Sequence, residues 1–335
     1  MRGVLSILSK FKPVSEFRIK KSIAGLFFMV SLNFVWAAGP LRPVNAKIRV
    51  SWPCDSCTYS FLATPEIYQQ RWDTLPQTRF WRTIMRTSPD SGYLSVTSNR
   101  EILCKLSTRE WLRLKPDAKN KLLDSLQICR CLGPDDQLLF TAGKSDFYQI
   151  TPVLSSIDQA VKIFEQENTD PFYAQAILLI ESPGRLQKSS AGAYGSFQLM
   201  KSVAIRMGLT VNAYTDERKD IEKSAWAAAK LIRTICLPET RYMLEKNGIR
   251  YNENDLWFRL LVLHVYHAGA GNVSPVLDKI CPSEGNPALI KQIWQTSCGY
   301  FKNSSQNYSQ LAIASLLELD QLILNNCRDS ASNVE

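Results

Sequence analysis

The sequence predicts a mainly α-helical protein in which a helical domain follows a small α+β region. From about residue 151 onward, apolar residues recur at helical spacing and strands do not alternate with helices. Between residues 39 and 150, two short segments of strand composition flank a helical pattern. The chain has 335 residues, enough for about two domains.

Residues 1–38 have the composition of a secretory signal peptide. Basic residues ending in Lys20-Lys21 precede the uncharged stretch 22–38, which ends in small residues, and cleavage is expected after Ala37 or Ala38. The alternative is an uncleaved anchor, but the stretch is slightly shorter than the ~20 residues of a spanning helix. We therefore expect export to the periplasm or cell envelope, with membrane contact only if the leader stays uncleaved.

Most of the positive charge lies in this leader. The whole chain carries +9 and the leader +5, which leaves +4 for the mature chain. This balance is too mild to indicate a nucleic-acid partner, although it would suit an acidic polymer.

Nine cysteines in an exported protein fit an oxidising compartment, and the odd number leaves at least one without an intramolecular partner. Cys54-x-x-Cys57 and Cys129-x-Cys131 approach zinc-ligand spacing, but zinc knuckles usually show two matched pairs. Disulfides or buried thiols are therefore favoured over a metal, and no cofactor is expected. A redox role for the first pair would need βαβ surroundings that are not apparent.

Residues 39–150 are predicted to form the α+β region. Strand composition appears at 93–97 and 137–142, and residues 108–127 read as a helix interrupted at Pro116. This region could position the protein on its substrate, bind an envelope partner, or only pack against the helices.

Helices follow in order from residue 151. Ser155 and Asp158 form a capping-box pattern ahead of an apolar stripe at Ile157, Val161 and Phe164. Further helices are predicted over 220–235, over 255–267 and over 310–326. The helix over 255–267 is apolar almost all round and should be central, ending at Gly269 and Gly271.

One helix ends on an isolated carboxylate. Asp170-Pro171 predicts the start of this helix, and Pro183 requires that it end near Ser182, which places Glu181 on the last turn after an apolar run. Desolvation there should raise the pKa of Glu181, so that a neutral carboxyl can protonate a leaving oxygen. The following loop offers serine hydroxyls, the Gln198 amide, and glycines at 192 and 195 that allow close backbone approach to a ligand. Such a cleft suits an amino-sugar polymer.

Three ordered segments carry a family resemblance. "ES" at 181–182, "SSAGAYGSFQLM" at 189–200 and "YHAGAGNV" at 266–273 resemble the signature of the lytic transglycosylases with the lysozyme-like fold. Residues 208–232 are also similar to the membrane-bound lytic murein transglycosylase D-like branch. The resemblance covers about residues 170–275 and implies that residues 151–335 form a lysozyme-like transglycosylase domain.

The resemblance also implies the roles of matched residues. Glu181 would be the sole acid/base, protonating the glycosidic oxygen between N-acetylmuramic acid and N-acetylglucosamine, then deprotonating the muramic C6 hydroxyl to close a 1,6-anhydro ring. Ordinary glycosidases need two carboxylates; here Asp216, Glu217 and Asp220 read as helix caps or dipole partners. The sugar cleft would be lined by Ser182, Ser190, Gln198, Met200, Tyr266 and His267.

One position departs from the family pattern. His267 stands where the family has Asn, and an imidazole differs from an amide in reach, charge and tautomer. We expect an effect on subsite contacts, pH response or activity, but none on the proposed acid. His264, one turn earlier, is predicted to be a core histidine rather than a metal ligand.

The sequence therefore predicts a peptidoglycan lytic transglycosylase whose partner is the glycan strand. A hydrolytic, lysozyme-type muramidase is the nearest alternative, and the two differ in whether water or the C6 hydroxyl attacks. A peptidoglycan-binding envelope protein without turnover is a third possibility that only His267 favours.

Overall fold

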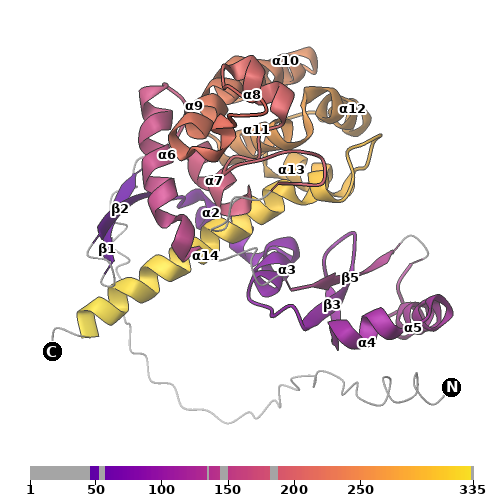
Figure 1. The fold of residues 1–335 in the computed structure, drawn as a ribbon. Coiled ribbons are helices and arrows are strands. Elements are labelled where there is room, and N and C mark those ends of the chain that lie inside the picture. Colours follow the sequence, from indigo (N-terminus) through magenta and orange to yellow (C-terminus); the bar gives the residue numbers. More distant parts are fainter. Residues whose placement is uncertain (1–45, 53–56, 134–135, 144–149, 182–187, 333–335) are drawn as a thin grey trace, which may run out of the picture.

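The computed structural model describes residues 46–52, 57–133, 136–143, 150–181 and 188–332. Figure 1 shows the long C-terminal helix α14 (Ser304–Ser332) running between a helical lobe and a smaller lobe. The smaller lobe holds β3, β4, β5, α4 and α5. The predicted leader, residues 1–38, lies outside the described residues, among which no helix is long and apolar enough to cross a bilayer.

The smaller lobe contains the predicted α+β elements. Strands β3 (Ser91–Val96) and β5 (Leu138–Ala142) lie where the sequence indicates, and β4 (Ile102–Ser107) completes an antiparallel sheet of order β4-β3-β5. Helices α4 (Thr108–Arg113) and α5 (Pro116–Cys129) confirm the interruption at Pro116. Proline stands at the first position of α5, where its missing N–H has no intrahelical partner to lose.

Several elements before residue 90 were not predicted. Strands β1 (Lys47–Trp52) and β2 (Cys57–Leu62) form an antiparallel hairpin, followed by α2 (Glu66–Gln69), the 3-10 turn η1 (Trp72–Thr74) and α3 (Pro76–Met85). The hairpin lies beside α6 (Leu154–Gln166) in Figure 1. Val50, Phe61 and Trp72 belong to the same buried core as the later helices. Residues on both sides of position 150 therefore build one core.

The capping box predicted at the start of α6 is wrong. No side chain caps this helix, which begins at Leu154 after the 3-10 turn η2 (Thr151–Val153). The Asp158 carboxylate instead accepts a hydrogen bond from the Ser60 backbone N–H at 2.9 Å and pairs with Lys162 at 2.6 Å. Asp158 thus attaches the β1–β2 hairpin to α6, whose predicted apolar stripe is buried.

The helical lobe is built around α11 (Leu256–Ala268), in which every residue from Leu256 to Val265 is buried, as predicted. The surrounding helices are α7 (Phe172–Glu181), α8 (Lys201–Met207), α9 (Ile221–Leu231), α10 (Leu237–Lys246), α12 (Ala270–Ile280) and α13 (Pro287–Gln295), with the 3-10 turn η3 (Glu217–Lys219) ahead of α9. A π-helical turn, η4 (Ile232–Cys236), joins α9 to α10. Gly269 ends α11 with φ of 79°, as expected, but the predicted end at Gly271 is wrong because that residue lies inside α12.

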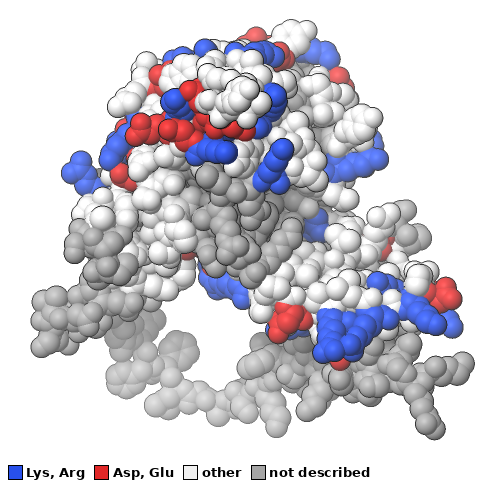
Figure 2. Space-filling view, in the orientation of Figure 1, with Lys and Arg blue, Asp and Glu red and all other residues white. Residues whose placement is uncertain are grey.

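Helix α14 extends the predicted segment 310–326 in both directions and packs against α7, α11 and α3. It therefore joins the helical lobe to α3, the helix that precedes the smaller lobe in the chain. In the view of Figure 2, acidic and basic side chains are mixed over the helical lobe, while Lys and Arg are more frequent on the smaller lobe. The mixed surface on this face agrees with the mild net charge of residues 39–335.

Candidate active site

Glu181 is the last residue of α7, and every residue before it in that helix is buried. The Asp170 carboxylate accepts a hydrogen bond from the Phe172 backbone N–H at 3.0 Å, which confirms the predicted cap. Asp170 also pairs with the buried Arg259 of α11 at 2.7 Å. These contacts fix the start of α7, so the position of Glu181 at its other end is set by a rigid helix.

Glu181 faces a cavity of about 460 Å³. This volume lies in the range of small-ligand pockets, roughly 300–1,000 Å³. The lining side chains come from α7, the loop before α8, the end of α11, the first turns of α14, and from α3 and β5 of the N-terminal region. They are Trp81, Ile84, Thr141, Ala142, Ile180, Glu181, Lys188, Ser189, Gln198, His267, Ser304, Asn307, Tyr308 and Leu311.

The cavity changes the acidity of Glu181. Burial raises the pKa of its carboxyl to about 7, and the neighbouring Tyr308 hydroxyl acts in the opposite direction. Burial and the proximity of Glu181 in turn raise the pKa of Tyr308. Among the described residues that line the cavity, no other side chain is a carboxylic acid. Glu181 can therefore bind or release a proton near neutral pH. Among the described lining residues, no second carboxylate is available as a base or nucleophile.

Gln198 lines the cavity from a loop that Arg218 organises. Gln198 has a positive φ of 45°, and its side-chain amide donates to the Gly195 carbonyl at 3.0 Å. The buried Arg218 guanidinium donates to the backbone carbonyls of Gly192 at 3.1 Å and Leu199 at 3.0 Å. Because Arg218 is held by Asp216 at 2.7 Å, the loop rests on an ion pair between a buried guanidinium and a half-buried carboxylate.

The expectation that Gly195 allows close approach to a ligand is wrong. A Cβ at this position would lie 1.8 Å from the backbone oxygen of Arg218. Position 195 therefore requires glycine because the loop packs directly against the Arg218 backbone. Gly192 differs, since a Cβ there would meet nothing within 4 Å.

His267 and Tyr308 line the cavity, whereas Tyr266, a predicted cleft residue, does not line it and instead supports the loop. The Tyr266 hydroxyl donates to the Phe197 carbonyl at 2.7 Å, which ties α11 to the loop, and its pKa is raised by burial and then by Glu181. His267 lines the cavity and stacks on Tyr308 with ring centroids 4.3 Å apart. The surrounding protein lowers the pKa of His267 to about 4, even though its surface is partly exposed, so the imidazole is neutral at pH 7.

The other predicted cleft residues do not gather here. Ser190 is exposed and does not line the cavity; the hydroxyl that does so belongs to Ser189. Met200 is exposed and borders a separate hollow beside Lys188 and Arg218. Ser182 lies outside the described residues.

Sequence reasoning missed the contributions of Tyr308, Asn307 and Trp81. Tyr308 lies just before the segment predicted as the last helix, and no motif marks it. Trp81 comes from a helix that was not predicted at all. These residues reach Glu181 only through the packing of α3 and α14, so no local pattern could have identified them.

The remaining predictions concern histidine, cysteine and acidic residues. His264 is a core residue, as expected: it is fully buried, and its Nε2 lies 2.8 Å from the Ser309 hydroxyl. Asp216 and Asp220 cap η3 and α9, as predicted. In the described part of the chain, no three His, Cys, Asp or Glu side chains gather in a way that could hold a metal ion. Six exposed or half-buried cysteines and the buried Cys236 have no disulfide partner among the described residues; the six are Cys104, Cys129, Cys131, Cys281, Cys298 and Cys327.

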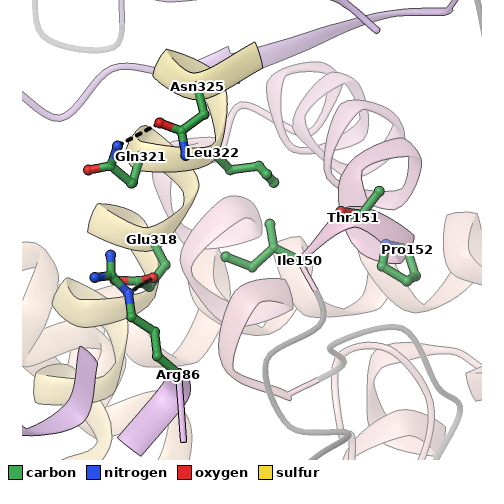
Figure 3. Close-up of a pocket in the computed structure, with 8 residues that line it drawn as sticks. All are labelled: Arg86, Ile150, Thr151, Pro152, Glu318, Gln321, Leu322 and Asn325. Atoms are coloured by element: carbon green, nitrogen blue, oxygen red, sulfur yellow. Dashed lines mark hydrogen bonds and ion pairs between the residues drawn. The ribbon is translucent and has the colours of Figure 1, made fainter. Parts of the chain in front are cut away.

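A wider hollow of about 740 Å³ lies elsewhere, between α14, the end of α3 and η2. Figure 3 shows its lining, in which Arg86 and Glu318 point toward one another and pair at 2.7 Å. Arg82 holds the same carboxylate at 2.6 Å. Glu318 is thus neutralised by two guanidinium groups, and this hollow offers no proton donor comparable with Glu181.

A central buried helix, α11, thus lies in the same core as α7, which ends on the half-buried Glu181. Residues 159–279 match the family model described as the transglycosylase SLT domain, and this part of the chain belongs to the lytic transglycosylases of the lysozyme-like fold. The protein is therefore an enzyme of the lyase class that acts on peptidoglycan. No curated protein matches the chain.

Proposed function

We propose that this protein is an exported lytic transglycosylase that cleaves the β-1,4 bond between N-acetylmuramic acid and N-acetylglucosamine without water, with Glu181 as the only acid/base. The observation that carries the proposal is a carboxyl with a pKa of about 7 in a cavity that has no second carboxylate among its described lining residues. A hydrolase of the usual kind would need a carboxylate pair across the scissile bond. The resemblance of residues 208–232 supports the D-like branch of the family.

In the proposed reaction Glu181 first donates one proton to the substrate and later takes one proton back. Neutral Glu181 donates its proton to the glycosidic oxygen, the bond from that oxygen to C1 of the muramic residue breaks, and N-acetylglucosamine leaves with a free 4-hydroxyl. The carboxylate then removes the proton from the C6 hydroxyl, whose oxygen bonds to C1 and closes the 1,6-anhydro ring. Glu181 ends protonated, so the cycle consumes no water. A pKa near 7 suits a group that must act as acid and base in turn.

Mass spectrometry of the products from purified peptidoglycan tests this proposal. Wild-type protein should release anhydro-muramic ends, and Glu181→Gln should release none. Glu222→Gln is the matched control, because it makes the same change at an exposed position on α9. Reducing ends from the wild type would assign the hydrolytic alternative, and sacculi that are bound but uncut would assign a binding protein.

Export is proposed from the leader alone. A fusion of residues 1–38 to a reporter that is active only outside the cytoplasm should give activity. Replacing Lys20 and Lys21 with glutamate should reduce it. An inactive wild-type fusion that accumulates inside the cell would contradict export.

A further inference from the structure

The cavity that holds Glu181 is completed by residues from outside the matched transglycosylase domain. The match spans 159–279, whereas Trp81 and Ile84 of α3 and Thr141 and Ala142 of β5 line the same cavity. The N-terminal region therefore forms part of the candidate active site, in addition to packing against it.

The α3 part of this wall is fixed to α14 by buried polar contacts. The Trp81 indole N–H donates to the Gln310 side chain at 3.0 Å, and Arg100 donates to the Asn307 side chain at 2.6 Å. The Arg100 guanidinium lies over the Trp81 ring, 5.7 Å from its centroid. Asn307 itself lines the cavity. Such contacts hold α3 in one position relative to the site.

The β5 part is fixed to the end of α3. Gly143 follows β5, and a Cβ there would lie 2.1 Å from the Thr87 backbone oxygen. The Gly143 backbone N–H also donates to the Ser91 carbonyl at 3.0 Å. The end of β5, with Ala142, is thereby held close to α3. Packing and hydrogen bonds between distant segments therefore fix both parts of the wall in place.

The contributions to the cavity differ in chemistry. The matched domain supplies mainly polar groups and one aliphatic side chain, through Glu181, Lys188, Ser189, Gln198, His267 and Ile180, and α14 adds Ser304, Asn307, Tyr308 and Leu311. The N-terminal wall supplies an indole, two aliphatic groups and one hydroxyl. An N-acetylated pyranose has hydroxyl and amide groups at its rim, together with C–H faces and an acetyl methyl. Apolar walls with a few convergent polar groups are typical of sites for such ligands.

We propose that Trp81, Ile84, Thr141 and Ala142 form a sugar subsite, in which the apolar wall packs against the C–H face or acetyl methyl of an N-acetylated pyranose adjoining Glu181. This inference rests on the proposed function, because it assumes a glycan in the cavity. It assigns the N-terminal region a direct role in substrate binding and specificity.

The test fills the subsite without removing core contacts. Ala142 is replaced by Val, Leu and Phe in the Glu181→Gln protein, so that no ligand is consumed. Affinity for a β-1,4 tetramer of N-acetylglucosamine is measured by calorimetry. Leu139→Trp is the control, since Leu139 is exposed on the same strand and does not line the cavity. Thermal unfolding of each variant shows whether it is folded.

We expect affinity to fall with side-chain size, roughly tenfold or more for Phe, and less than about twofold for Leu139→Trp. Equal affinity across the Ala142 series, or an equal loss in the control, would overturn the subsite. Should Ala142→Phe fail to fold, the Val and Leu variants still give the trend with size. Product analysis of the wild type is a separate readout. Anhydro products with unaltered affinity in the series would refute the subsite alone, and size-dependent binding without anhydro products would refute the proposed reaction alone.

Discussion

Replacing Glu181 with glutamine should stabilise the folded protein at alkaline pH while it removes catalysis. Burial raises the pKa of Glu181 from 4.5 to about 7. Between these values the folded protein binds more protons than the unfolded chain. The stability that the neutral carboxyl contributes is therefore fully present below pH 4.5 and is lost as the pH rises through 7.

The size of this effect follows from the two pKa values. Their difference corresponds to roughly 3 kcal/mol between the neutral and ionised forms. Because the Glu181 side chain keeps part of its exposure to water, we expect about 2–3 kcal/mol of lost stability in the wild type at pH 8. Glutamine has nearly the same shape as glutamate and no charge, so the free energy of unfolding of Glu181→Gln should not show this decrease at pH 8.

Chemical denaturation of both proteins at pH 4.5, 6 and 8 measures the difference. The free energy of unfolding of Glu181→Gln should exceed that of the wild type at pH 8 and match it at pH 4.5, while the exposed control Glu222→Gln shows no such trend. Turnover of glycan should fall about a hundredfold or more in Glu181→Gln. A stability difference that does not change with pH would refute the assignment of a raised pKa to Glu181.

Three further predictions concern the same site. Since the first step needs neutral Glu181, kcat/KM of the wild type should fall above pH 7, and a flat profile to pH 9 would contradict that requirement. Tyr308→Phe removes the hydroxyl that lowers the pKa of Glu181, so this alkaline limb should move to higher pH; a limb that stays in place would show that Tyr308 does not act on the acid. Gly195→Ala brings a Cβ within 1.8 Å of the Arg218 oxygen at a φ of 82°, and should cost at least about 2 kcal/mol of unfolding free energy. Gly192→Ala, at a φ of 90° with open space around it, is the matched control and should cost about 1 kcal/mol; equal losses in urea titrations would refute the packing argument for Gly195.

Local patterns predicted the elements whose signals are strong over short distances. The central helix α11 was identifiable because it is apolar on all sides, and the start of α7 because Asp170-Pro171 combines a cap with a fixed φ. The hairpin β1–β2 was missed because its burial depends on partners far away in the chain. Strand β4 pairs with β3 across a short turn, but only Leu103 in it is buried, so its local apolar pattern is weak. Asp158 shows the same limit, since its capping pattern was overridden by a contact with Ser60, 98 residues away.

Some of the predicted site residues line the cavity and others do not. Glu181, Gln198 and His267 were found from the sequence, and the structure brings them together around one cavity. Ser190 and Met200 lie away from it, because a loop's residue order does not decide which side chains turn inward. The role of Gly195 was misread for a related reason: its close neighbour is the backbone of Arg218, 23 residues later, rather than a ligand.

By itself, the sequence indicated Glu181 as the candidate acid, its position at the end of a buried helix, and the helical character of the domain around it. These follow from residue type and from spacing within a few turns of chain, where local physics is decisive. Only the tertiary structure decided that the acid has no second carboxylate beside it among the described residues, that Tyr308 of α14 adjusts its pKa, and that α3 and β5 close the cavity. Those properties depend on desolvation and on contacts between segments that are distant in the chain, which local sequence patterns do not encode.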